Sequence, residues 1–227
     1  MKIRMLLSLS CLLLALLLCP SLPVADVYHP QTPVYIKSQA LKLSGEPGEP
    51  SIRIWRVASE SLSQDGGMSI FFSPKESQSP LCRVDLSAAG EVIDSEIPGA
   101  AGNVLKKPDF LFVPGYPAPC DFFPQALLHL ETAEASASFK VTRKIGGERF
   151  VDEICIQTRP VSAQKARANG WLKASTPDVS GPLRLVKAVN CRSGRLISLQ
   201  VWPTDADWWV YEETPYRRSW QIDELND

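Results

Sequence analysis

The sequence predicts a mostly-β protein, an antiparallel sandwich or barrel-like meander with one short helix near residues 162–168. Short apolar runs recur along the chain between turn residues, a spacing typical of antiparallel strands. Within several runs apolar and polar residues alternate, as they do in a strand with one buried face. A composition of 44% hydrophobic and 22% charged residues indicates a globular chain rather than a disordered one.

Residues 1–25 have the layout of a secretory signal peptide. Lys2 and Arg4 precede a nearly unbroken apolar run over residues 5–18, and prolines and small residues follow it. The apolar run is shorter than the roughly 20 residues that a membrane span needs. We therefore expect export to the periplasm or secretion, with a soluble mature protein and no membrane span after the signal is removed.

Cleavage of the signal is expected after Ser21 or Ala25, of which Ala25 is preferred. Cys19 raises the question of a lipid-modified N-terminus. The residue before it is Leu18, whereas lipoprotein signals have a small residue there. Lipidation of Cys19 is therefore not expected.

The rest of the chain divides into three predicted parts. Residues 26–50 form a Pro- and Gly-rich arm, residues 51–160 a β-rich domain, and residues 161–227 a short helix followed by an aromatic-rich meander packed on the same core. In the arm, only residues 34–37 are expected to pair as a short strand. Further strands are expected at residues 51–58, 68–72, 82–86, 91–94, 109–113, 126–131, 135–143, 149–157, 183–190 and 196–202. Ser162 is expected to cap the helix, and Asn169-Gly170 to end it.

Export determines how the cysteines are interpreted. The mature chain retains Cys82, Cys120, Cys155 and Cys191, and disulfide bonds are the default in an oxidising compartment. Four cysteines allow three connectivities, and proximity in sequence favours Cys82–Cys120 with Cys155–Cys191. The gaps between these cysteines are far longer than those of zinc sites.

Several classes of function are excluded or disfavoured by composition. Removal of Lys2 and Arg4 with the signal, and of no acidic residue, takes the formal net charge from −1 to −3, so nucleic-acid binding is not expected. The only histidines are His29 and His129, too few for a three-histidine metal site. No G-x-S-x-G motif marks a serine nucleophile. We predict neither a metal nor a cofactor.

An aromatic stretch at residues 202–220 holds four of the six tryptophans. The favoured interpretation is a core hairpin, because large aromatic side chains are usually buried. In that hairpin Trp208 and Val210 share one face, and Trp209 and Tyr211 share the other. The second interpretation places part of the stretch in a groove that stacks on a ligand, since aromatic and arginine side chains are common binding anchors. Its candidate ligand-binding residues are Trp202, Trp208, Trp209, Tyr211, Tyr216, Arg217, Arg218 and Trp220.

We expect an exported, non-catalytic protein that binds an envelope protein or a polysaccharide, or that assists assembly of an envelope complex. A local basic patch is expected if the turn at residues 191–195 and the segment at residues 214–220 lie at the same end of the sheet; it would hold Arg192, Arg195, Arg217 and Arg218. The alternative is a carbohydrate-active hydrolase, which needs two carboxylates beside sugar-stacking rings. Its candidate carboxylates are Asp205, Asp207, Glu212 and Glu213.

Overall fold

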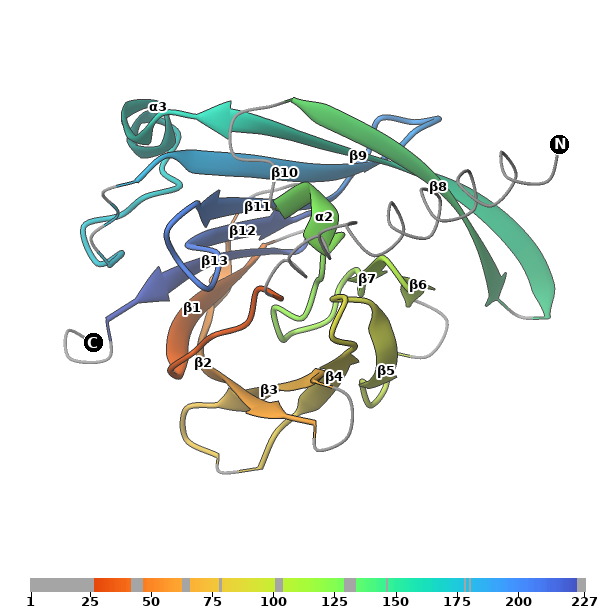
Figure 1. Ribbon diagram of the computed structural model, residues 1–227, viewed down its shortest axis with the longest axis horizontal. Coiled ribbons are helices and arrows are strands. Elements are labelled where there is room, and N and C mark those ends of the chain that lie inside the picture. Colours follow the sequence, from red (N-terminus) through yellow and green to blue (C-terminus); the bar gives the residue numbers. More distant parts are fainter. Residues whose placement is uncertain are drawn as a thin grey trace, which may run out of the picture.

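One large, strongly curved antiparallel sheet of eleven strands organises the molecule in the computed structural model (Figure 1). The described residues are 27–41, 47–62, 66–77, 79–100, 104–128, 134–145, 147–177, 179 and 181–223. The fold is mostly β, as the sequence predicts. The expected signal peptide, residues 1–25, lies outside the described residues.

The sheet consists of two meanders joined side by side. The first runs through β1 (Val34–Leu41), β2 (Pro47–Ser61), β3 (Met68–Pro74), β4 (Cys82–Leu86) and β5 (Val92–Glu96). The second runs through β8 (Ala135–Ile145), β9 (Glu148–Val161), β10 (Leu183–Asn190), β11 (Leu196–Pro203), β12 (Tyr211–Thr214) and β13 (Arg217–Ile222). Between them in sequence lie β6 (Leu105–Lys107), β7 (Phe110–Phe112) and α2 (Gln125–Leu128), and α3 (Ala163–Ala168) follows β9.

β1 joins the two meanders, because it pairs with β2 on one side and with β13 on the other. The sequence led us to expect only a short strand at residues 34–37 in an arm, and this was wrong. Tyr35, Lys37 and Gln39 alternate with Ile36 and Ser38 along the strand, so one face of β1 points into the core and the other points outward. The core-facing Ser38 hydroxyl lies 2.9 Å from the hydroxyl of Ser219 on β13.

The concave side of the sheet is filled by the chain itself. β6, β7 and α2 lie between the two curved halves (Figure 1), and Phe110, Phe112 and Phe123 are buried there among the residues of the main core. We expected a strand at residues 126–131, and this was wrong at the described residues, where α2 forms instead. The helical turn of α2 begins directly after Pro124, whose carbonyl accepts a hydrogen bond from the Leu127 N–H. β6 pairs with β7 apart from the main sheet.

A smaller core lies on the convex side, under α3 and the segment that follows it. α3 begins where expected: the Ser162 side chain accepts a hydrogen bond from the Lys165 backbone N–H, and Asn169 caps the other end. Ala166 of α3 is buried against Leu185 and Val201 of the sheet in this second core. The helix is therefore held by packing on one end of the convex face.

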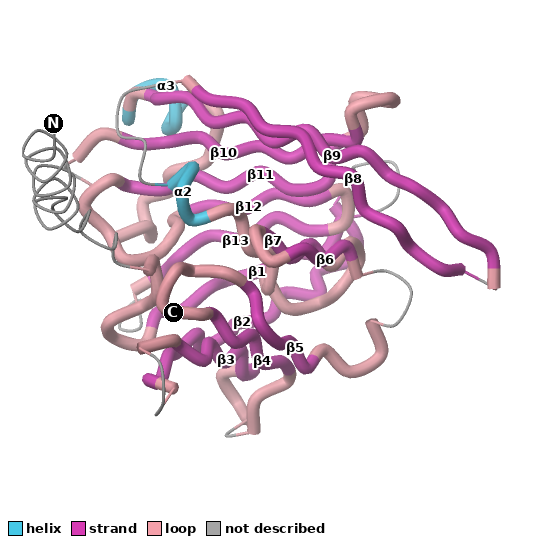
Figure 2. The backbone as a smooth tube through the Cα atoms, turned by 45° about the vertical axis from the view of Figure 1, so that its right-hand side comes forward, coloured by secondary structure: helices cyan, strands magenta, loops and turns pink. Residues whose placement is uncertain are grey.

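The hairpin of β8 and β9 extends beyond the rest of the sheet (Figures 1 and 2). β10 pairs with β9 only as far as Ile154, so residues 148–153 pair with β8 alone. Near the tip of this two-stranded ribbon, Phe150 and Val151 are 43% and 63% exposed. We call residues 140–145 and 147–153 the ribbon.

Candidate functional site

The aromatic stretch lies largely in the core. Trp202, Trp208 and Trp209 are all buried on the concave side, and the Trp202 and Trp208 rings meet edge to face at a centroid distance of 5.7 Å. The expectation that Trp208 and Trp209 lie on opposite faces was wrong, because both belong to the main core. Residues 208–210 precede β12 rather than forming part of it, so the alternation of a strand does not apply to them.

Strand alternation separates the two arginines of β13. Arg217 points to the concave side, where its guanidinium forms a buried ion pair with Glu212 and donates hydrogen bonds to the carbonyl oxygens of Tyr116 and Ala118. Arg218 points to the convex side and pairs with Glu213 at 3.2 Å. The two arginines therefore cannot contribute to one patch, contrary to the patch expected from the sequence.

The buried ion pair belongs to a larger polar network. Gln200 donates hydrogen bonds to the Glu212 carboxylate and to the Asp121 carbonyl, both at 3.0 Å, and accepts one from the Trp202 indole N–H. The Asp121 carboxylate accepts a hydrogen bond from the Val113 backbone at 2.8 Å. This network fastens the proline-rich loop at residues 114–124 to the sheet, and its groups have protein partners.

Asp121 titrates abnormally in this setting. Burial raises the pKa of its carboxyl to about 7, and the negative charge of Glu212 raises it further, while Arg217 and the Val113 N–H oppose the shift. Perturbed carboxyls often mark catalytic sites, but the Asp121 side chain is enclosed by the core and lines none of the surface hollows in the described part of the chain. Its position favours a structural role.

The convex side of β13, β1 and β2 gathers basic and aromatic side chains. Lys37 lies opposite Trp220 on β13 and Ile54 on β2, and Gln39 lies opposite Arg218. Directly paired residues of neighbouring strands project to the same side of a sheet, so these side chains share one surface. We call this surface the basic face; its members are Tyr35, Lys37, Arg56, Lys75, Lys173, Arg218 and Trp220.

Two cations of the basic face lie over aromatic rings. The Lys173 ammonium is 3.5 Å from the centroid of the Trp220 ring, and the Lys75 ammonium is 5.8 Å from that of Tyr35. Burial lowers the pKa of Lys173, and the nearby charges of Lys37 and Arg218 lower it further. The three cations are therefore close enough to repel one another. A hollow of about 150 Å³ lies beside them, lined by Lys37, Gln39, Ile52, Lys173, Ser175, Trp220 and Ile222.

The turn at residues 191–195 and the segment around Tyr216 do meet at one end of the sheet. The Arg195 guanidinium donates a hydrogen bond to the Tyr216 hydroxyl at 3.3 Å. Both residues line a hollow of about 600 Å³ at the base of the ribbon, which we call the ribbon groove. Its lining is Leu105, Pro114, Gly115, Arg143, Asp152, Asn190, Ser193, Arg195, Leu196, Ile197, Pro215 and Tyr216.

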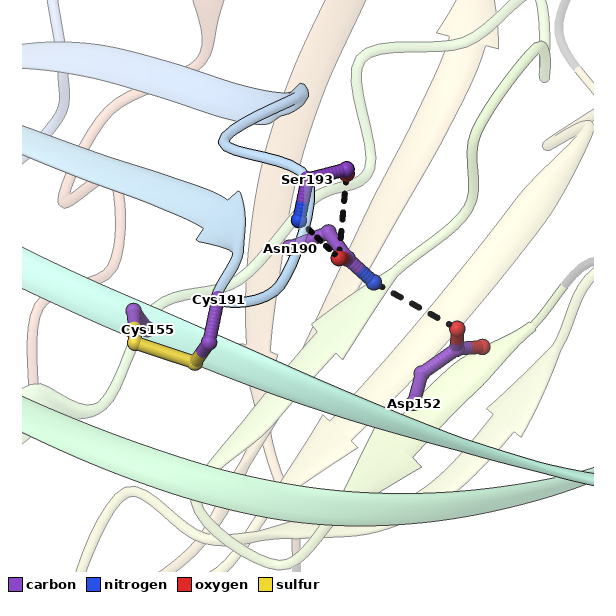
Figure 3. The surroundings of a disulfide bond; sticks show 5 residues. All are labelled: Asp152, Cys155, Asn190, Cys191 and Ser193. Atoms are coloured by element: carbon purple, nitrogen blue, oxygen red, sulfur yellow. Dashed lines mark hydrogen bonds between the residues drawn. A yellow bond between two sulfur atoms is a disulfide. The ribbon is translucent and has the colours of Figure 1, made fainter.

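A disulfide between Cys155 and Cys191 fixes the turn against β9 at this groove (Figure 3). The Cys191 N–H also donates to the Glu153 carbonyl. This is one of the two expected cysteine pairs, and a disulfide is typical of an oxidising compartment. Cys82 and Cys120 are buried free thiols in this structure, and a hydrogen bond with Cys82 contributes to raising the pKa of Cys120.

The carboxylates of the hydrolase hypothesis do not converge. Glu212 lies in the buried network and Glu213 on the opposite side of β12, where it pairs with Arg218 and accepts a hydrogen bond from the Tyr211 hydroxyl. Asp205 and Asp207 are exposed in the turn after β11.

His29 lies 3.1 Å from the Ser59 hydroxyl, and His129 lies outside the described residues. Within the described part of the chain, no cluster of three or more histidine, cysteine or acidic side chains could hold a metal. No described helix is long and apolar enough to cross a membrane.

Sequence reasoning missed most of the basic face. The alternation of Tyr35, Lys37 and Gln39 with smaller or apolar residues was a usable signal for a two-faced strand. Nothing local indicated that Lys173 folds over Trp220. Arg143 and Asp152, which line the ribbon groove together with Arg195, come from strands distant in sequence, and no local pattern indicated that they would meet. Comparison with known proteins gives no guide to either surface: no family model, curated protein or solved structure matches this chain.

Proposed function

We propose that this chain is an exported, non-catalytic binding protein, periplasmic or secreted, and that it binds an anionic polysaccharide through the basic face. The observation that carries the proposal is the convergence of Lys37, Lys173 and Arg218 around Trp220. Like charges repel, and although Glu213 pairs with Arg218, an anionic ligand would further reduce the repulsion among these cations. The mature chain is expected to be acidic overall, which makes this basic face a local feature.

The chemistry of the basic face suits a sugar polymer better than a lipid bilayer. Proteins that bind at a membrane interface insert exposed aromatic or aliphatic side chains into it. Here Trp220 is only 7% exposed, and the Lys173 ammonium covers its ring. Ile52 is the one largely exposed aliphatic side chain among the residues that line the adjoining hollow. The cations are spread across β13, β1 and β2, and Gln39 lies among them. Such a row can pair with carboxylate or sulfate groups that repeat along a polymer while amide and ammonium groups donate to hydroxyls.

The arrangement of the carboxylates supports binding without hydrolysis. A glycosidase needs two carboxyl groups about 5–10 Å apart on either side of the scissile bond. Glu213 lies beside the basic face, and Arg218 and Tyr211 already engage it. We therefore do not assign hydrolysis to this surface.

Calorimetric titration of the oxidised protein with polygalacturonate, with neutral dextran as the control polymer, tests this proposal. Binding of polygalacturonate is expected to weaken as salt is raised, because exposed charges are screened within about 10 Å at 0.1 M. Replacing Lys37 and Lys173 by methionine together should lower the affinity at least about tenfold, the equivalent of ~1.4 kcal/mol. Lys140→Met, on the ribbon, is the matched control and should leave the affinity unchanged.

Three outcomes would overturn the proposal. One is that dextran binds as well as polygalacturonate. Another is that Lys140→Met weakens binding as much as the double variant. The third is that the protein sediments with phosphatidylglycerol vesicles but shows no heat of binding with the polysaccharide, which would identify a lipid surface instead.

A further inference from the structure

The ribbon groove is a second hollow, separate from the basic face, and the proposed function does not use it. Its volume of about 600 Å³ is within the range of small-molecule sites, which combine apolar walls with a few placed polar groups. The walls here are Leu105, Leu196 and Ile197 with two prolines. Its position at the base of the ribbon leaves it open to solvent on one side.

Most polar groups of the groove already have partners in the protein. Arg143 and Asp152, which lie on facing strands of the ribbon, form a half-buried ion pair. Asn190 donates to the second oxygen of Asp152 at 3.5 Å and accepts from the backbone N–H and hydroxyl of Ser193 (Figure 3). These bonds, together with the disulfide, set the shape of the groove without leaving its one carboxylate unpaired.

Arg195 differs from these residues. Its guanidinium donates to the Tyr216 hydroxyl and, within the described part of the chain, it forms no ion pair with a carboxylate. A guanidinium has five N–H donors, and the Tyr216 hydroxyl, which accepts one of them, keeps its own proton to donate. Both groups therefore present unused donors to the same hollow, beside apolar walls.

We propose that the ribbon groove binds the carboxylate of a ligand that has an apolar body. Arg195 holds the carboxylate oxygens through its parallel N–H donors, the preferred geometry for this pairing, and the Tyr216 hydroxyl donates a further hydrogen bond. The apolar body lies along Leu196, Ile197 and Pro215. With Arg143 and Asp152 neutralising each other, Arg195 gives the groove a net positive charge.

Two sources share this chemistry: the free C-terminal end of a peptide and a small carboxylic acid. The probes are N-acetyl-leucyl-leucine, the same dipeptide with an amidated C-terminus, and hexanoate, each titrated into ¹⁵N-labelled oxidised protein and followed by amide NMR shifts. We expect the dipeptide acid to shift groove signals and to bind at least tenfold more tightly than its amide. Hexanoate binding as tightly as the dipeptide acid identifies a simple carboxylate as sufficient; weaker binding identifies a peptide end.

Two substitutions on one turn separate the proposal from general charge effects. Arg195→Met should lower the affinity for the dipeptide acid at least tenfold, whereas Arg192→Met, on the same exposed turn but outside the groove, should leave it unchanged. The proposal would be overturned if the dipeptide acid and its amide bound equally well, or if both variants lost affinity for the acid to the same extent. It would also be overturned if no probe bound at a concentration of about 10 mM. We expect Arg195→Met to bind polygalacturonate as the parent protein does, so a failure of the groove proposal can be distinguished from a failure of the basic-face proposal.

Discussion

Adjacent residues of β12 and β13 take opposite roles because strand alternation sends them to opposite sides of the sheet. Arg217 and Glu212 form a buried pair, whereas Arg218 and Glu213 form a partly exposed one. Removing one partner of a buried pair leaves an uncompensated charge and typically costs about 3–5 kcal/mol, whereas an exposed pair contributes about 0–1 kcal/mol. Arg217 thus fixes the proline-rich loop, whereas the neighbouring Arg218 is available to a ligand.

Asp121 makes stability depend on pH. Its pKa is raised in the folded protein from 3.8 to about 7, so the folded state binds a proton more tightly than the unfolded state does. The stabilisation from this proton is complete below about pH 4 and is lost as pH rises through about 7. We expect the free energy of unfolding, measured by urea denaturation, to be higher at pH 5 than at pH 8. Asp121→Asn should reduce this difference.

Asp207→Asn is the matched control for Asp121→Asn, because it makes the same chemical change at a residue that is exposed, in the turn after β11. It should leave the difference in unfolding free energy between the two pH values as it is in the parent protein. A parent protein that is more stable at pH 8 than at pH 5, with Asp121→Asn showing the same profile, would contradict the assignment of this effect to Asp121.

Among the elements, the β8–β9 hairpin has the least support from its neighbours. A two-stranded ribbon is marginally stable by itself in water, and residues 148–153 pair only with β8. The Cys155–Cys191 disulfide and the Cys191–Glu153 backbone hydrogen bond lie where the ribbon leaves the sheet. They fix both the direction of the ribbon and the position of the turn that carries Arg195.

Removal of this disulfide tests that role. Replacing Cys155 and Cys191 together by serine should lower the free energy of unfolding by about 2–4 kcal/mol, mainly because the unfolded chain is no longer constrained. Hydrogen exchange should increase most at the backbone amides of residues 148–153 and 191–195. Exchange that rises equally over all strands would show that the bond stabilises the whole fold without any particular effect on the ribbon.

For the whole molecule, the decisive contacts join segments that are distant in sequence. β1 pairs with β13 across almost the whole chain, and Arg217 of β13 fastens the loop that contains Cys120. Cys82 on β4 approaches the same loop, since its thiol hydrogen-bonds to that of Cys120. The proline-rich loop is therefore held from both halves of the curved sheet.

If the chain is exported as proposed, we predict that Cys82 and Cys120 form a second disulfide once residues 1–25, which contain Cys11 and Cys19, have been removed. Two thiols would lose two protons and two electrons to the disulfide of a thiol oxidase in the export compartment, which is thereby reduced to a dithiol. Alkylation of the denatured, unreduced protein with iodoacetamide, followed by intact-mass measurement, should show no modified cysteine. Recovery of two alkylated residues, Cys82 and Cys120, would mean that this pair remains reduced.

The β-rich class, the β4 and β10 strands and the capped helix α3 could be predicted from the sequence, because each depends on residues that are close together in the chain. Apolar alternation locates a strand, and Ser162 marks the start of α3 whatever surrounds it. Burial of the tryptophans agreed with the favoured interpretation of the aromatic stretch, since their apolar area is too large to leave mostly exposed.

Tertiary structure alone decided which surfaces exist. Local pattern cannot reveal that β1 is central, because one of its two partners, β13, comes from the other end of the chain. Nor can it reveal that Lys173 covers Trp220. The sequence placed Arg217 and Arg218 together as neighbours, whereas the sheet directs one into the core and the other to the basic face. Strand and helix propensity is a local property of the chain, but a binding surface depends on the pairing of distant strands, which local sequence does not encode.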